Sequence, residues 1–256
     1  MFVFLSKKLV HMKLKFLFSF LLLLSSIQLY AQLKMDIEGG LVLGTSYNKV
    51  RIPNAGGTTV NLAEDLSINP KIFYRIRAGY TIAKRHNVSL LFAPLTVTYQ
   101  GDFDRNINFN NTVFLAEQPV KVHYKFNSYR LTYRYDIISR ARAQVGVGLT
   151  AKIRDADVRF KSESADTHFD NLGFVPLVNF YVALKPSYRW SVILEGDALA
   201  SKQGRAEDIF AGVAYQVNTK LGIKLGYRVV EGGADVDDVY NFNWINYASA
   251  GLLFTL

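Results

Sequence analysis

Hydrophobic and polar residues alternate along most of the chain after residue 31. Between Ala143 and Arg154 the odd positions are apolar, whereas the even positions hold Gln, Gly, Thr, Lys and Arg. The same period of two recurs at 71–82 and at 221–229. Successive side chains of a strand point to opposite faces, so this pattern predicts long strands with one apolar face. Segments of this kind lie at 35–52, 70–82, 87–103, 120–138, 142–160, 172–185, 190–202, 206–217, 220–231 and 242–256.

The connections between these segments alternate in length. Short ones lie at 83–86, 139–141, 186–189 and 218–219, and long ones at 53–69, 104–119, 161–171 and 232–241, while the link at 203–205 is short. Long strands with alternating loops predict an all-β fold, a transmembrane antiparallel up-and-down barrel with short periplasmic turns and longer external loops. We expect about ten strands, with eight or twelve as alternatives. A soluble sandwich or lipocalin-like barrel is the rival fold, and its apolar residues would face inward.

The first 31 residues have the pattern of a secretory signal peptide. Four lysines precede an apolar run at 16–24, and Ala31 supplies a small residue before a polar one. We therefore predict export through the Sec pathway, cleavage after Ala31 and a barrel domain at 32–256, with Met12 as an alternative start. Removing residues 1–31 removes four lysines and no acidic residue, which lowers the formal charge from +9 to +5.

The amino-acid composition excludes several kinds of site and partner. The chain has no cysteine, which excludes disulfides, cysteine-based metal sites and a lipoprotein anchor. The mild positive charge is not gathered in one run, so we expect no nucleic-acid partner. Aromatic residues near the predicted strand ends suit the girdles of a membrane barrel. We assign to these girdles Tyr80, Tyr99, Tyr133, Tyr135, Tyr188, Trp190, Tyr227 and Trp244.

The last strand carries a further signal. Ala248, Ala250, Leu252, Phe254 and Leu256 alternate up to the end of the sequence. With this terminal strand and its overall architecture, the chain resembles bacterial outer-membrane β-barrel proteins, although many of these end in Phe rather than Leu. The resemblance implies a place in the outer membrane, contact with its lipids and lipopolysaccharide, and insertion by the barrel-assembly machinery.

If the apolar parity faces lipid, the opposite parity lines a lumen. Ten strands enclose a narrow space, so charges inside it should pair with one another. A salt-bridged plug is the first reading, and a porin-like cationic lining that passes small anions is the second. The predicted lumen charge network is Asp36, Glu38, Arg75, Arg77, Arg130, Arg134, Asp136, Lys152, Arg154, Glu195, Asp197, Lys224 and Arg228.

Two prolines lie inside strand-like segments, and a proline cannot donate to a β-ladder. The apolar parity also changes near Pro94, Asn127 and Asp155, which indicates β-bulges at these positions. We hypothesise a lateral opening that admits an acyl chain or another apolar ligand. Its residues, with a small apolar pocket behind the prolines, are Leu91, Pro94, Val175, Pro176, Leu177 and Tyr181.

No catalytic constellation stands out. Neither His86, His123 nor His168 has a neighbouring serine in a recognisable pattern, and the acidic residues at 231–238 lack the complete calcium-loop spacing. We therefore expect no catalytic residues, no metal and no cofactor. The expected function is a non-enzymatic outer-membrane barrel with a structural, binding or narrow-transport role. The alternative is a lipid-modifying enzyme, or a barrel that takes a hydrophobic ligand through the lateral opening.

Overall fold

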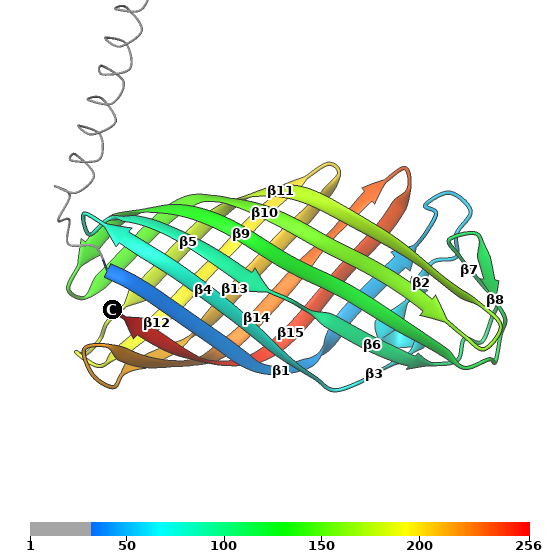
Figure 1. Cartoon of the computed structure of the whole chain (residues 1–256), viewed down its shortest axis with the longest axis horizontal. Helices are drawn as coiled ribbons and strands as arrows, with labels where there is room; N and C mark the ends of the chain where they lie inside the picture. The colour runs from blue at the N-terminus through cyan, green and yellow to red at the C-terminus, as the bar shows by residue number, and fades with distance from the viewer. Residues whose placement is uncertain (1–31) are drawn as a thin grey trace, which may run out of the picture.

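The computed structural model describes residues 32–256, and the predicted signal peptide lies outside them. Ten long antiparallel strands form one closed barrel (Figure 1). Each strand pairs with the next along the chain, and the first pairs with the last. They are β1 (Gln32–Arg51), β4 (Lys71–Ile82), β5 (His86–Ala93) continued by β6 (Thr96–Gly101), β9 (Val120–Arg140), β10 (Ala143–Lys161), β11 (Asp166–Leu184), β12 (Trp190–Ser201), β13 (Gly204–Gln216), β14 (Leu221–Val236) and β15 (Val239–Thr255). The predicted up-and-down barrel is thus confirmed.

The two ends of the barrel differ. One end carries four short turns and both ends of the described chain (Figure 1). At the other end, two long connections hold β2 (Val60–Asn61), α2 (Leu62–Asp65), β3 (Ser67–Ile68) and the hairpin of β7 (Ile107–Phe109) and β8 (Thr112–Phe114). The long loops expected at 161–171 and 232–241 are instead tight turns, because the neighbouring strands continue into them. Within residues 32–256, no helix is long and apolar enough to cross a membrane.

At one level of the barrel, the outward-facing side chains of the wall change from apolar to polar and the inward-facing ones from polar to apolar. Asn127 accepts a hydrogen bond from the backbone N–H of Leu95 (3.0 Å) and donates one to Asp155 (3.1 Å), so β6, β9 and β10 meet there. On the short-turn side of this level, the outward side chains of β9 and β10 are apolar, as at Leu131 and Leu149. On the other side, the outward positions are polar and the inward positions are apolar. We call this level the polarity boundary.

The expected bulges are absent at the polarity boundary, which corrects the sequence interpretation. Ala93 pairs with Ser128 and Thr96 pairs with Lys125, so the register of β5 and β6 against β9 is unbroken across Pro94. The β9–β10 register is likewise continuous through Asn127. The apolar parity changes because the surroundings of the wall change, while the backbone alternation does not.

The interior beyond the polarity boundary is an apolar core. Phe160 stacks on Phe109 with ring centroids 4.1 Å apart, and both are almost fully buried. Tyr99, which we assigned to an aromatic girdle, is completely buried in this core. This part of the barrel is therefore built like a soluble protein, with a polar surface and an apolar inside.

The part on the short-turn side has the reverse arrangement. Its exposed surface carries a band of large apolar side chains, including Leu41, Ile72, Leu90, Leu131, Leu149 and Leu225. An apolar band around a closed antiparallel barrel is typical of a wall that spans a membrane. The band is the membrane-spanning part, and the barrel beyond the polarity boundary extends outward from the membrane.

Candidate functional site

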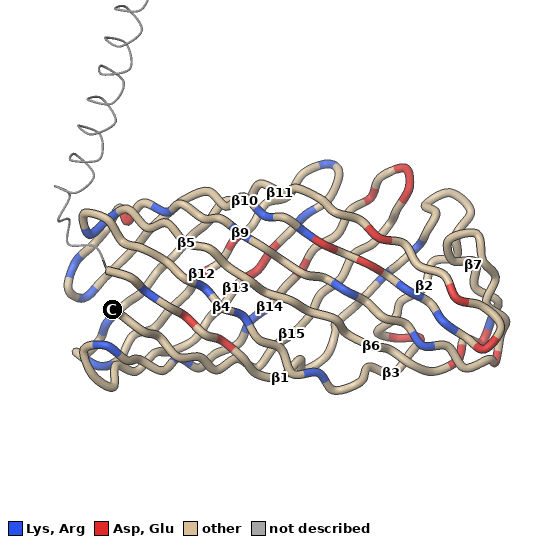
Figure 2. The backbone as a smooth tube through the Cα atoms, viewed as in Figure 1, with Lys and Arg blue, Asp and Glu red and all other residues tan. Residues whose placement is uncertain are grey.

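The charges predicted to lie in the lumen do lie on the inner face of the barrel. Figure 2 shows acidic and basic positions on strands at the middle of the barrel, where the outer surface is apolar. These residues alternate along each strand with lipid-facing residues, so their side chains point into the barrel. Arg134 and Asp136 pair near the short-turn end, at 3.0 Å. Most of the others gather in one cluster at mid-height.

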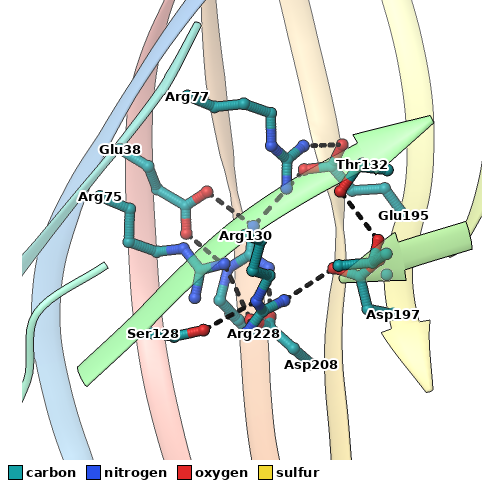
Figure 3. A network of polar contacts seen from close by, with 12 residues as sticks. Glu38, Arg75, Arg77, Ser128, Arg130, Thr132, Glu195, Asp197, Asp208 and Arg228 are labelled. Carbon is teal, nitrogen blue, oxygen red and sulfur yellow. Dashed lines mark hydrogen bonds and ion pairs between the residues drawn. The ribbon is translucent and has the colours of Figure 1, made fainter. Parts of the chain in front are cut away.

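This cluster is a continuous set of ion pairs, which we call the lumen network. Arg228 contacts Glu38 through Nε (2.6 Å) and Asp208 through Nη1 (2.6 Å). Figure 3 shows these groups directed toward one another, with Arg130 on the other side of Asp208. The bases are Arg75, Arg77, Arg130, Lys224 and Arg228, and the acids are Asp36, Glu38, Glu195, Asp197 and Asp208. Five positive and five negative side chains make the lumen network formally neutral.

Asp208 is the member that the sequence interpretation missed. Its carboxylate accepts from Arg75 (2.8 Å), Arg130 (2.6 Å) and Arg228 (2.6 Å), and the residue is 2% exposed. No other carboxylate in the described chain contacts three arginines. Asp208 lies four residues before Gly212 on β13 and has the same inward parity, so the alternation along this strand identifies it.

An aromatic ring supports the lumen network from the side. The centroid of Phe210 lies 4.8 Å from Nζ of Lys224 and 5.2 Å from Cζ of Arg228. A Cβ atom at Gly212 or Gly226 would lie 2.6 or 2.7 Å from this ring. These glycines therefore leave room for Phe210, which in turn faces two cations and offers them a favourable π-face.

Two predicted lumen cations, Lys152 and Arg154, form no ion pair within residues 32–256. Lys152 is buried and has no carboxylate partner within residues 32–256, but its Nζ lies 4.8 Å from the ring centroid of Phe126. Arg154 donates to Asn171 (2.6 Å), and its buried Nε has no partner in the described structure. Both lie on β10 close to Asp155 of the polarity boundary, so these two bases without an acidic partner are grouped beside the neutral network.

Three lumen carboxylates lie close enough together to suggest a cation site. Asp36, Glu38 and Glu195 each direct an oxygen to the same place. Nζ of Lys224 lies 2.6, 2.8 and 3.6 Å from their oxygens. The lysine ammonium therefore provides the positive charge that a metal ion would supply there.

A vestibule opens from the short-turn end. It has a volume of about 270 Å³ and is lined by polar groups that include Lys34, Arg134 and Gln144. Its inner end is formed by Arg77 and Lys224 of the lumen network. Beyond the lumen network lies the apolar core.

The proposed opening residues fall into two groups. Leu91 and Pro94 lie on the β5–β6 wall, whereas Val175, Pro176, Leu177 and Tyr181 lie on β11. Strands β9 and β10 separate the two groups, and no cavity in the described structure is lined by both, so the single apolar pocket that we expected is not formed. Tyr181 instead faces the vestibule, with Arg134 4.1 Å from its ring centroid.

Near Pro176, however, the strand pairing of the wall is incomplete. Strand β11 pairs with β10 along its whole length, but with β12 only from Val178 to Leu184. One edge of β11 between Asp166 and Leu177 therefore has no strand partner among the described residues. Leu172 and Phe174 of this edge are 74% and 66% exposed. We call this place the β11 notch.

The three histidines of the described chain lie apart from the lumen network. Nδ1 of His86 is 2.9 Å from the Tyr133 hydroxyl at the short-turn end. Beyond the polarity boundary, His123 lies 3.2 Å from Thr98 Oγ1, and His168 lies 3.1 Å from Asp157 Oδ1. The last two are on the outer surface of the barrel.

Comparisons with known proteins give only distant likenesses. No protein-family model matches the chain, and no curated protein resembles it in sequence. Among solved structures, it is similar to the outer-membrane protease OmpT from Escherichia coli (11% identity, 88% of this chain and 97% of that one, TM-score 0.49). It is also similar to the outer-membrane protein OprG from Pseudomonas aeruginosa (12%, 87% and 95%, 0.38) and to Ail, the attachment invasion locus protein of Yersinia pestis (10%, 87% and 99%, 0.39). The closed wall and its apolar band, rather than these likenesses, identify the chain as a membrane-spanning β-barrel.

Proposed function

We propose that this protein is a non-conducting, non-enzymatic outer-membrane barrel with a structural and binding role exerted by the part that extends beyond the membrane. The observation that carries the proposal is the filled lumen. The neutral lumen network occupies mid-height, and the apolar core occupies the outer part. An apolar core with stacked rings offers no route for a hydrated ion, so narrow transport is the less favoured reading.

The ion pairs of the lumen network also account for its charges without a transported solute. Each carboxylate of the network lies within 4.0 Å of a lysine or arginine nitrogen, and each base has at least one acid. Removing paired charges from water is costly unless their geometry is good, and these side chains form several hydrogen bonds each. The network therefore supports a structural role inside the barrel.

Conductance tests the closed lumen. The purified protein, inserted in a planar bilayer in KCl, should give no stable open steps. The same preparation should migrate differently on a gel before and after heating, because this mobility change reports a folded barrel. Stable, anion-selective steps from folded protein would overturn the closed lumen and favour the cationic transport reading.

The β11 notch favours a second candidate function, entry of an acyl chain or apolar ligand through the wall. Leu172 pairs with Asp155 of the polarity boundary, so the stretch of the unpaired edge from Leu172 to Leu177 lies within the apolar band. Lipid cannot satisfy free backbone groups, which makes an unpaired edge at this depth costly in the absence of a ligand or water. Arg154, with its unpartnered Nε, lines a small cavity of about 30 Å³ behind the notch.

Mass spectrometry of protein purified in a mild detergent distinguishes the two functions. If the notch holds an acyl chain, the wild-type protein should retain lipid, and Phe174→Ser should retain much less. Leu149→Ser is the matched control, because Leu149 is equally exposed on a strand paired on both sides. Absence of lipid from the wild-type protein, or equal loss in both variants, would exclude the notch as a ligand entry.

A further inference from the structure

The outer surface beyond the polarity boundary has a groove on the side of β1 and β15. It consists of two adjoining hollows of about 230 and 410 Å³, which share Lys49 and Tyr240 in their walls. Tyr47, Arg205 and Phe242 complete the smaller hollow. The larger one is lined in addition by Arg51, Thr59, Asn61, Glu64, Asp65 and Arg105. We call this surface the β1–β15 groove.

Two arginines of the groove are stacked on aromatic rings. Cζ of Arg51 lies 5.0 Å from the ring centroid of Tyr240, and Cζ of Arg205 lies 5.1 Å from that of Phe242. The two rings contact each other at 5.3 Å. A Cβ atom at Gly233 would lie 2.5 Å from Phe242, so the glycine allows this ring to lie against β14. Stacking fixes the guanidinium planes while leaving N–H groups at their edges, which suits binding of a phosphate.

The groove has cationic capacity that the protein does not use internally. Lys49 and Arg51 have no carboxylate within 4.0 Å among residues 32–256. Nε and Nη2 of Arg51 donate to Asn54 Oδ1, which leaves Nη1 free. Arg205 pairs with Glu231 and donates through Nη2 to the Tyr47 hydroxyl, so its Nη1 also has no partner. These donors surround the aromatic floor of the groove.

The position of the groove points to a lipid rather than a soluble partner. Its lower wall, Tyr47, contacts Trp244 edge to face at 6.2 Å. Asn246 Oδ1 accepts from Trp244 Nε1 and from the Tyr227 hydroxyl. Below Tyr227 the outward side chains of β14 are Leu225 and Ile223 of the apolar band. Aromatic side chains of this kind mark the interface between hydrocarbon and headgroups, so the groove begins at headgroup height.

We propose that the β1–β15 groove binds the phosphorylated saccharide headgroup of an outer-leaflet glycolipid of the lipopolysaccharide type. Lys49, Arg51 and Arg205 contact the phosphates, while Glu64 is placed to accept hydrogen bonds from sugar hydroxyls. The volume of the two hollows suits a headgroup of one or two sugar rings. This inference rests on the proposed binding role and names its partner class. The conductance test concerns only the lumen, so either conclusion can fail while the other stands.

The test measures binding of diphosphorylated lipid A to the purified full-length protein in detergent, by thermophoresis. Lys49→Gln combined with Arg51→Gln should weaken binding about 10-fold, the effect of losing at least one charge-assisted hydrogen bond to phosphate. Lys121→Gln is the control, because it removes an exposed cation from the external part of β9, away from the groove. This control should bind as the wild type does.

Two further arms decide the ligand chemistry. Lipid A with its phosphates removed should bind the wild type and the double variant equally weakly. Free glucosamine 1-phosphate should compete poorly, because it lacks the membrane anchor that concentrates the headgroup at the groove. Wild-type affinity in the double variant, equal loss in Lys121→Gln, or full competition by the free sugar phosphate at similar concentration would each overturn the glycolipid site.

Discussion

Replacing Asp208 by Asn tests how the lumen network contributes to stability. The change preserves the size of the side chain but removes one of five negative charges from a neutral, buried cluster. Arg75, Arg130 and Arg228 then share the remaining acids, and Arg75 loses the one carboxylate it contacts. Because removing one partner of a buried ion pair leaves an uncompensated charge, we expect a loss of about 3–5 kcal/mol in the free energy of unfolding.

The assay is urea unfolding of the protein in lipid vesicles, followed by tryptophan fluorescence. The chain has two tryptophans, Trp190 and Trp244, and they lie near opposite ends of the apolar band, so both report on the folded barrel. Asp166→Asn serves as the control, since Asp166 forms an exposed ion pair with Arg159. Exposed pairs contribute about 0–1 kcal/mol, so the control should shift the transition little.

A second variant separates charge balance from other effects of the substitution. Arg75→Gln combined with Asp208→Asn returns the cluster to equal numbers of acids and bases, and should recover part of the loss. Equal stability of Asp208→Asn and the control would refute the argument from charge balance. So would a double variant that is less stable than the wild type by the sum of the losses measured for Arg75→Gln and Asp208→Asn alone.

Three other predictions follow from the wall and the surface. Leu149→Arg puts a charge in the apolar band and should cost about 2–4 kcal/mol in urea unfolding, whereas His123→Arg, beyond the polarity boundary, should cost little; equal costs would contradict the boundary. Gly226→Val puts a Cβ atom against the backbone oxygen of Ala211 and the ring of Phe210, and should cost about 1–3 kcal/mol; an unchanged midpoint of unfolding would contradict this close packing. The hydrogen bond from Arg159 lowers the pKa of Asp166 below its ordinary value, so the stability from this pair is present above about pH 4 and is lost as the pH falls through the folded-state pKa. An NMR titration should show this lowered pKa and its return toward the ordinary value in Arg159→Gln.

The strands were accessible from the sequence because lipid on one side and a polar lumen on the other enforce strict alternation. The same reasoning identified most of the lumen network, since a charge opposite a lipid-facing residue has nowhere else to point. Asp208 was missed because it lies close to the start of its strand, where the alternation is short. Its three arginine partners come from β4, β9 and β14, and sequence spacing does not reveal such contacts.

The alternation of apolar and polar residues could not predict the other features of the structure. The change of apolar parity at Pro94 was interpreted as a bulge, although a change of solvent produces the same pattern with a regular backbone. The short elements between 53 and 69 have two to four residues each, too few to show a period. The β11 notch arises because β12 and β13 end earlier than β11, which is a matter of relative strand height rather than of any one segment.

The polarity boundary also ties the length of each strand to the thickness of the membrane. Each strand must present its apolar outward residues over the same height, so the number of residues between a short turn and the boundary is constrained. Inserting two residues into the lower half of β9 would keep every side chain on its own face, yet raise Asn127 by roughly 6.6 Å relative to Leu95 and Asp155. A segment of β9 with lipid-facing apolar side chains would then lie beside segments of the adjacent strands with water-facing polar side chains. Insertions and deletions should consequently be tolerated in the outward extension and excluded from the segment beneath it, even where they preserve the alternation.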